Sequence, residues 1–441
     1  MDQADSVNSD PVDTTDGEGR VQRWRNCIGF WLLGLCNNFG YVVMLSAAND
    51  ILKKQESQNT TVHALTNVEM MNSSNSSRYD CNPVSTAAVL LADILPTLII
   101  KLTAPFYIHK VPYGFRVLVC FITAVVSFLM VSFSSTVLMS LFGVVFASVS
   151  AGLGELSFLS LSVFFNRNVL NGWGSGTGAA GVGGALLYSV FTQAGLTPRI
   201  SLMIMLFVPV ILAVSYFFLL AFPASFPQWS RSEVSHSSSA VENVQERRPL
   251  IEEVADTEHE EEQGNGDKRI RPLTFTDKLK IMKGLGKFIV PLGLVYFAEY
   301  YINQGLMELL YFPDSRLSHP EQYRWYQTLY QIGVFFSRTS LFFFKIRKIL
   351  LFCLLQCVNA VLLSVAVYYQ FLPNPWVVFI IVFYEGLLGG AAYVNTFYFI
   401  SKETADRERE FAMAAASVGD SLGIALSAAA SFPVHHYFCS L

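Results

Sequence analysis

The stretch VYFAEYYINQGLMELLYF, residues 295–312, places a glutamate in the middle of a long apolar run. Glu299 lies about halfway along the apolar segment 286–311, which is long enough to cross the ~30 Å hydrocarbon core of a bilayer as a helix. A carboxylate at that depth costs about 3 kcal/mol or more unless it faces water or a partner. The segment therefore predicts a membrane-spanning helix in which Glu299 has a partner or a function.

Apolar stretches of similar length recur through the rest of the 441-residue chain. Hydrophobic residues make up 52% of it and charged residues only 15%, whereas a soluble globular chain carries about 25% charged residues. We therefore expect an all-α, polytopic membrane protein with about eleven transmembrane helices. The expected spans are 26–49, 85–108, 115–134, 136–161, 174–193, 200–222, 286–311, 322–344, 349–370, 376–400 and 410–431.

Basic residues mark one side of the predicted helices as cytosolic, because Lys and Arg accumulate in loops on that side. Residues 1–25 are polar, lack the apolar core of a secretory signal, and are expected to be a disordered cytosolic N-terminus. The basic residues of later short loops on the same side are Lys110, Arg116, Arg167, Lys345, Arg347, Lys348, Lys402, Arg407 and Arg409. The opposite side holds the 50–84 loop, whose acceptors Asn59, Asn72 and Asn75 predict a glycosylated lumenal segment.

Residues 223–285 form the one long connection on the cytosolic side, and their Ser, Glu and Arg content is typical of disorder. Within them, Glu246, Leu250 and Ile251 fit an acidic dileucine sorting signal that clathrin adaptors would read. The alternative is a chance Leu-Ile pair in a polar loop. The segment 274–285, TFTDKLKIMKGL, is expected to form a basic amphipathic helix along the inner leaflet.

The linker separates a six-helix bundle expected in 26–222 from a five-helix bundle in 286–431, with 432–441 as a C-terminal tail. The two halves resemble each other in three places and in the same order. GLCNNFGYVVML matches YFAEYYINQGLMEL, GLGELSFLSLSVFFN matches GLLGGAAYVNTFYFIS, and GTGAAGVGGALLYS matches AAASVGDSLGIALS. This pattern indicates two repeat-related bundles from a parallel six-helix duplication that lacks its twelfth helix.

Polar residues at membrane depth concentrate in spans 1, 2, 4, 7, 8, 10 and 11, and are predicted to line a central cavity between the halves. Spans 3, 6 and 9 are expected to be apolar outer helices. The expected substrate-binding residues are Asn37, Asn38, Tyr41, Lys101, Glu155, Glu299, Tyr300, Asn303, Gln304, Arg338 and Asn395. The residues expected to couple or gate the movement of a substrate are Asp93, Glu385 and Asp420.

Arg338 and Lys101 lie at similar depths in repeat-related spans, so they could grip one anion from opposite sides. The planar guanidinium suits a phosphate or carboxylate, and the lysine acts as a point charge. The sequence leaves two alternatives open. Arg338 could form an internal salt bridge with Glu299 while Lys101 extends to the interface, or these groups could serve gating or proton coupling.

Two motifs suggest other chemistry. The glycine-rich run 171–184 lacks the GK[ST] ending of a phosphate loop, and its small residues at four-residue spacing predict close helix packing. GDSLG, residues 419–423, matches a serine-hydrolase elbow, but Ser421 is expected inside a helix and not at a strand–turn–helix junction.

Five of the seven cysteines lie in or beside spans, so no disulfide framework is expected. We expect no metal, no cofactor, no nucleic-acid partner and no enzymatic activity.

Five long stretches carry a resemblance to a known family: CNNFGYVVMLSAANDIL (36–52), VPYGFRVLVC (111–120), GLGELSFLSLS (152–162), GWGSGTGAAGVGGALLYS (172–189) and VYFAEYYINQGLMELLYF (295–312). By them the chain resembles the battenin family, the lysosomal membrane proteins of juvenile neuronal ceroid lipofuscinosis. The resemblance implies a lysosomal and late-endosomal location and a major-facilitator-like fold, distantly similar to equilibrative nucleoside transporters. It also implies a role in clearing glycerophosphodiesters, glycerophosphoglycerol above all, from the lysosome.

One feature departs from the family pattern. Family members can end in a prenylation box, but here only Ser440 and Leu441 follow Cys439. An odd number of spans would also place this end in the lumen, away from the cytosolic enzyme. Prenylation of Cys439 is therefore not expected.

The sequence and the resemblance together predict a transporter that moves a small anionic phosphodiester from lysosome to cytosol by alternating access. A membrane enzyme acting on lysosomal lipids is one alternative, although the expected spans contain no histidine. A trafficking scaffold without transport activity is the other. The 223–285 segment would suit a scaffold, whereas the intramembrane charges would be unnecessary for it.

Overall fold

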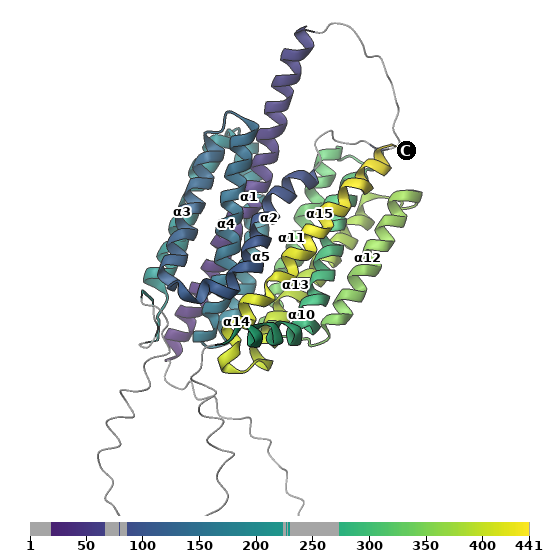
Figure 1. Cartoon of the computed structure of the whole chain (residues 1–441). Helices are drawn as coiled ribbons and strands as arrows, with labels where there is room; N and C mark the ends of the chain where they lie inside the picture. The colour runs from purple at the N-terminus through teal and green to yellow at the C-terminus, as the bar shows by residue number, and fades with distance from the viewer. Residues whose placement is uncertain are drawn as a thin grey trace, which may run out of the picture.

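The computed structural model describes residues 19–66, 79, 86–223, 226, 228, 229 and 273–440. Every regular element in these ranges is a helix, and Figure 1 shows the long helices side by side in one bundle. The expected glycosylation sites Asn72 and Asn75 and the expected sorting signal of Glu246, Leu250 and Ile251 lie outside the described residues.

Helical segments occupy all eleven expected spans. The first half contains α1 (Arg20–Thr66), α2 (Thr86–Tyr107), α3 (Tyr113–Ser132), α4 (Val137–Leu161), α5 (Asn168–Gln193), α6 (Pro198–Ile204), α7 (Phe207–Val214) and a π-helical turn, η3 (Ser215–Leu219). The second half contains α10 (Phe275–Tyr301), the π-helical η4 (Ile302–Leu306), η5 (Met307–Leu309), α11 (His319–Thr339), α12 (Ile349–Tyr369), α13 (Pro375–Glu403), α14 (Asp406–Ala416) and α15 (Val418–Cys439). Short 3₁₀ turns follow α2, α4 and α11: η1 (Ile108–Lys110), η2 (Ser162–Phe164) and η6 (Ser340–Phe342).

Within the described residues, seven helical segments are long and apolar enough to cross a membrane, judged by length and composition. Outward faces carry apolar side chains such as Ile99, Val290 and Val358, which are 60%, 60% and 65% exposed. Apolar residues all round a helix are typical of segments that face lipid on one side and protein on the other. The expected all-α, polytopic membrane fold is confirmed.

α1 extends beyond the C-terminal bound of its expected span, and α10 begins before the N-terminal bound of its span. α1 continues past residue 49 to Thr66 and includes Asn59, in a segment expected to be a loop, because no Gly or Pro interrupts residues 41–66. α10 begins at Phe275, so the amphipathic segment expected at 274–285 belongs to the same helix as the seventh span. A capping box starts this helix: Asp277 N–H donates to Thr274 Oγ1 at 3.2 Å, and Thr274 N–H donates to Asp277 at 3.1 Å.

The last span also differs from expectation. α14 and α15 divide it at Ser417, and α15 continues to Cys439, so residues 432–439 of the expected tail are helical. Phe438 in this extension is buried against Tyr79, with ring centroids 5.5 Å apart, and the Tyr79 hydroxyl donates to the Val367 carbonyl at 2.9 Å. Burial of this aromatic pair favours continuation of the helix. Cys439 is disulfide-bonded. The five cysteines in or beside spans, on which the expectation of no disulfide framework rests, are free.

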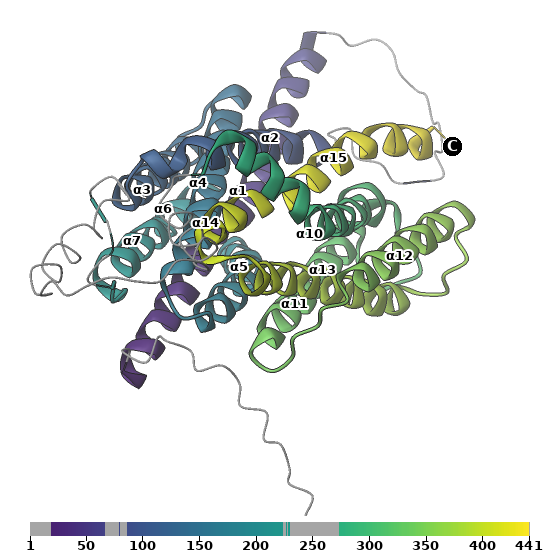
Figure 2. The same cartoon turned by 60° about the horizontal axis from the view of Figure 1, so that its bottom comes forward.

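The two halves repeat the same helix pairings. α1 packs against α5 and α2 against α4 in the first half, and α10 packs against α15 and α11 against α13 in the second. The halves meet where α2 packs against α15 and α5 packs against α11, again a symmetric set. α3 and α12 lie at opposite outer edges of the bundle in Figures 1 and 2. This arrangement supports the duplication that the sequence predicts and brings the polar spans to the interface.

One end of the bundle, at the bottom of Figure 1, is where α1 begins, α2 ends and α14 lies; we call it the α14 end. Figure 2 turns this end forward. It includes the short loops whose basic residues predict a cytosolic side. The halves are joined there by hydrogen bonds from Tyr113 to Glu410 at 2.6 Å, from Lys278 to the Phe106 carbonyl at 2.9 Å, and between Ser175 and Thr339 at 3.0 Å.

The glycine-rich α5 packs closely on both of its neighbours, as its small residues predict. A Cβ at Gly176 would collide with the Trp31 carbonyl of α1. On the other face, a Cβ at Gly178 would lie 2.9 Å from the Phe335 Cα of α11, in the opposite half. Missing side chains thus let three backbones approach one another. The expected packing role of residues 171–184 is confirmed.

This packing predicts that Gly176→Ala lowers the free energy of unfolding by about 1–3 kcal/mol, because α1 and α5 must move apart to admit the methyl group. Thermal unfolding of the purified protein in detergent measures the change. Gly183→Ala is the matched control, because it lies on the same helix with nothing within 4 Å of its Cβ position. Equal stability of the two variants would contradict the packing argument.

Candidate functional site

Lys101 of α2 lies at the centre of a buried ion-pair group. Its ammonium donates to Glu155 Oε2 of α4 at 2.7 Å and to the two carboxylate oxygens of Asp420 of α15 at 3.0 and 3.2 Å. The three residues are 1%, 9% and 4% exposed. Glu155 belongs to the same half as Lys101, and Asp420 belongs to the other half. We call these three residues the Lys101 triad, which ties the halves together inside the bundle. Lys101 therefore does not extend to the interface.

Arg338 of α11 occupies the repeat-related position but has neutral partners. Its guanidinium donates to the Thr177 hydroxyl of α5 at 2.8 Å and to the Tyr296 hydroxyl of α10 at 3.1 Å, and it lies 4.5 Å from the centre of the Tyr393 ring. The residue is partly exposed, and its Nε has no hydrogen-bond partner. Within the described part of the chain, the ion pair with Glu299 that the sequence left open does not form.

Tyr393 of α13 connects these two cations. Its hydroxyl donates to Glu155 Oε1 at 2.6 Å, accepts from Trp173 Nε1 at 3.3 Å, and its ring faces Arg338. A continuous path of contacts therefore runs from Lys101 through Glu155 and Tyr393 to Arg338, from one half of the bundle to the other. The sequence predicted that the charges converge, but not that Lys101 would already be neutralised.

A second group of acids lies between α10, α11 and α13. Asn303 Nδ2 donates to Glu385 Oε1 at 3.2 Å and to the Glu299 carbonyl at 3.1 Å, and the Tyr330 hydroxyl donates to Glu299 Oε1. All four side chains are buried. The Glu299 carboxylate thus has a hydrogen-bond partner, the Tyr330 hydroxyl, instead of a cation.

The remaining expected site residues fall into two groups by exposure. Asn38, Tyr41, Tyr300 and Gln304 are half-buried, and the hydroxyls of Tyr41 and Tyr300 meet across the halves at 3.5 Å. The buried members are Asn37, which donates to the Ala151 carbonyl at 3.1 Å, Asp93, whose carboxylate oxygens have no partner, and Asn395, which accepts from the Ile346 N–H at 2.6 Å. Asn395 therefore holds the loop before α12 and lies apart from the charged groups.

Sequence reasoning missed four aromatic and hydroxyl partners of these charges: Trp173, Thr177, Tyr330 and Tyr393. Tyrosine and tryptophan are counted with the hydrophobic residues, and none of the four lies within one helical turn of a charged residue, so the sequence carries no signal for them. The expectation that span 9 carries no polar residue was wrong, because Gln356 and Asn359 of α12 are buried there.

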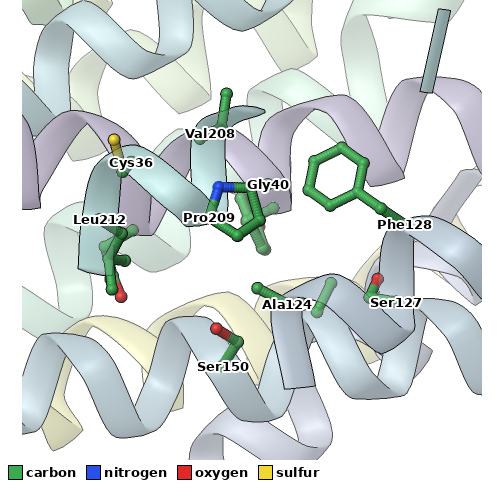
Figure 3. A pocket seen from close by; sticks show the side chains of 12 residues that line it. Cys36, Gly40, Ala124, Ser127, Phe128, Ser150, Val208, Pro209 and Leu212 are labelled. Atoms are coloured by element: carbon green, nitrogen blue, oxygen red, sulfur yellow. The ribbon is translucent and has the colours of Figure 1, made fainter. Parts of the chain in front are cut away.

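A small cavity of about 20 Å³ lies within the first half, bounded by α1, α3, α4 and α7. Asn37 and Tyr41 of the expected site line it together with Ser127 and Ser150, and Figure 3 shows Ser127 near Ala124 and Phe128, with Pro209 and Leu212 among the other lining residues. A polar space of this size holds about one water molecule. It is therefore too small for a substrate and lies away from Arg338.

Ser421 of the GDSLG motif lies in the first turn of α15, and its hydroxyl donates to the neighbouring Asp420 at 3.0 Å. The motif thus lies at the start of α15, just after the break at Ser417 between two helices, and not at a strand–turn–helix junction. Its aspartate serves the Lys101 triad.

Helix pairing, the symmetric interface and buried charges between two bundles define a multi-pass membrane protein of major-facilitator type. The fold is similar to that of a bacterial homologue of the human lysosomal transporter Spinster, in an inward-facing and unoccupied conformation, with TM-score 0.52 and 12% identity over 93% of this chain and 82% of that one. It is also similar to the human organic anion transporter MFSD10, with TM-score 0.54 and 12% identity over 96% of this chain and 95% of that one.

Residues 28–441 match the CLN3 protein family, and the chain belongs to it. It is 53% identical to battenin of Canis lupus familiaris over 418 residues, which cover 95% of this chain and 92% of that protein. It is 38% identical to protein BTN1 of Yarrowia lipolytica over 415 residues, which cover 93% of this chain and 94% of that protein. The resemblance that the sequence carries is confirmed at the level of family.

The Lys101 triad predicts a large stability loss for Lys101→Met. Removing the cation leaves Glu155 and Asp420 buried without their partner, which costs about 3–5 kcal/mol in thermal unfolding of the purified protein. Lys287→Met is the matched control. Lys287 forms a 3.0 Å ion pair with Glu403, but its side chain is 61% exposed. An ion pair at such an exposed position contributes at most about 1 kcal/mol. Similar losses in both variants would show that the triad contributes no more than a surface pair.

Proposed function

We propose that this protein is a transporter that exports a small anionic phosphodiester from the lysosomal lumen to the cytosol by alternating access. Glycerophosphodiesters, and glycerophosphoglycerol above all, are the proposed substrates. The family, the major-facilitator fold and the two-bundle interface support transport. The family resemblance supports the lysosomal and late-endosomal location and the substrate class.

The observation that carries the substrate proposal is the setting of Arg338. Its hydrogen bonds go to two neutral hydroxyls, those of Thr177 and Tyr296, and its Nε is unpartnered. A guanidinium held at membrane depth without an anion is costly unless it meets water or a ligand. A phosphodiester oxygen would supply the missing negative charge through charge-assisted hydrogen bonds.

Half-buried polar groups suit the rest of such a substrate. Asn38 and Tyr41 lie on α1, and Tyr300 and Gln304 lie on the repeat-related segment α10–η4, in the opposite half. Their amides and hydroxyls can donate to and accept from glycerol hydroxyls. A ligand bound between them and Arg338 would contact both halves, as alternating access requires.

The Lys101 triad suits the role of a gate. The Lys101–Asp420 ion pair connects the two halves, and the hydrogen bonds at the α14 end connect them as well. Opening that end toward the proposed cytosolic side must break the Lys101–Asp420 pair, whereas Lys101–Glu155 stays within the first half. Glu155 and Asp420 are therefore assigned to gating and Arg338 to the substrate.

In purified proteoliposomes, Arg338→Ala is expected to lower the kcat/KM of glycerophosphodiester transport at least tenfold, up to the loss of measurable uptake. A charged hydrogen-bond pair contributes about 1.5–3 kcal/mol, which corresponds to a tenfold to hundredfold change. Arg338→Lys keeps the positive charge but loses the planar guanidinium, so its kcat/KM is expected to lie between those of the wild type and Arg338→Ala. Arg347→Ala is the control, since Arg347 is 70% exposed and paired with Glu403. Unchanged uptake kinetics in Arg338→Ala would remove this residue from the site.

Delivery to the lysosome is proposed to depend on the dileucine signal in the cytosolic linker. Replacing both Leu250 and Ile251 by Ala is expected to shift the protein toward the cell surface, because clathrin adaptors would no longer bind the segment. Surface biotinylation measures the shift, with Leu273→Ala outside the motif as the control. Staining that stays wholly lysosomal in the double variant would refute sole reliance on this signal.

A further inference from the structure

Glu299, Asn303, Tyr330 and Glu385, which we call the carboxylate cluster, contain more acceptors than donors. The Asn303 amide donates to Glu385 and to the Glu299 carbonyl, and the Tyr330 hydroxyl donates to Glu299. These contacts use the side-chain donors. Three buried oxygens have no hydrogen-bond partner: Glu299 Oε2, Asn303 Oδ1 and Glu385 Oε2.

The excess of acceptors over donors indicates that the missing partner carries a positive charge. The four side chains are 1%, 3%, 6% and 0% exposed in chain order, so water does not solvate the two carboxylates. Among the described residues, no Lys or Arg pairs with Glu299 or Glu385 within 4 Å. An anionic substrate would be repelled, whereas a small cation would find two carboxylates and an amide oxygen, the ligands that hard cations prefer.

The backbone around the cluster is built to hold it. α10 changes to π-helical geometry at Ile302–Leu306, which includes Asn303, and π-helical turns are frequent at functional sites. Opposite, on α13, Gly389 leaves room for the Glu299 carboxylate, because a Cβ at that position would collide with its oxygens. A wider helix turn and a missing side chain therefore make space for two acids in a dry interior.

We propose that the carboxylate cluster binds a monovalent cation, Na⁺ or a proton, that is coupled to the substrate. This inference deepens the proposed transport function and rests on it for the coupling, although the binding itself does not require transport. The path for coupling is short. Tyr296, which holds Arg338, is one helical turn from Glu299 on α10, and Tyr330 is about 12 Å along α11 from Arg338. Filling the cluster would neutralise charge beside the proposed anion site and let both ligands cross together.

Cation binding is tested on the purified full-length protein by thermal unfolding, without any transport. Na⁺ is titrated against choline at constant ionic strength and neutral pH, and a second series lowers the pH with Na⁺ absent. A rise in the unfolding midpoint with Na⁺ in the wild type, lost in Glu385→Gln and Glu299→Gln, identifies a sodium site. A rise only on acidification, also lost in both variants, identifies a proton site.

The control is Glu403→Gln, on the same helix as Glu385 but ion-paired to Lys287 and Arg347. It is expected to keep the wild-type response. Other titratable groups around the cluster, namely Tyr296, Tyr300, Arg338 and Asp420, are present in every variant, so the difference between wild type and Glu385→Gln isolates the cluster. A midpoint that responds to neither cation, or a response that survives in both cluster variants, overturns the inference.

Transport assays separate this inference from the proposed function. Phosphodiester uptake that requires Arg338 but is insensitive to Na⁺ and pH in wild type and Glu385→Gln alike overturns coupling and leaves the transporter proposal standing. A cluster-dependent cation response without any phosphodiester uptake overturns the proposed substrate and leaves the cation site standing. A cation gradient that accelerates uptake at least tenfold in wild type, and not in Glu385→Gln, supports both.

Discussion

Charge buried in a dry helix bundle must be matched, and this constraint organises the centre of the molecule. Moving a lone ammonium from water into the protein interior costs several kcal/mol of desolvation free energy. Two carboxylates at hydrogen-bond distance offset that cost only while they stay in place. Lys101 draws one carboxylate from each half of the bundle. The interface at this depth is therefore closed by a pair that is strong when intact and expensive to separate, unlike the apolar contacts around it, which lipid could replace.

Exposure divides the remaining polar groups by their chemistry. The acids Asp93, Glu155, Glu299, Glu385 and Asp420 are buried. The partly exposed groups are Arg338 and the neutral side chains Asn38, Tyr41, Tyr300 and Gln304. The partly exposed set thus offers one positive charge and several neutral hydrogen-bonding groups, while the acids are buried. This division supports the proposal of an anionic substrate with hydroxyl groups.

Hydropathy and charge predicted the all-α, polytopic membrane fold, because bilayer thickness and burial cost act on each helix separately. Pairing could not be predicted in the same way. Whether Lys101 meets a substrate or Asp420 depends on the register between α2 and α15, which are 319 positions apart at that pair. Tyr393, which faces Arg338, was missed because no charged residue lies within one helical turn of it, and the extension of α15 because its packing partner Tyr79 lies far away in the chain.

The two halves place a cation in different settings, which breaks the symmetry of the scaffold. Lys101 and Arg338 lie in equivalent helices, and each contacts the fourth helix of its own half and a helix of the other half. The first meets Glu155 and Asp420, and the second meets Tyr393 and Thr177. Acids pair with one cation while the halves are closed, whereas neutral groups position the other without neutralising its charge. If the halves part at the α14 end, Asp420 loses its cation and needs a proton or another positive group. Movement of the proposed gate is therefore tied electrostatically to what the central groups bind.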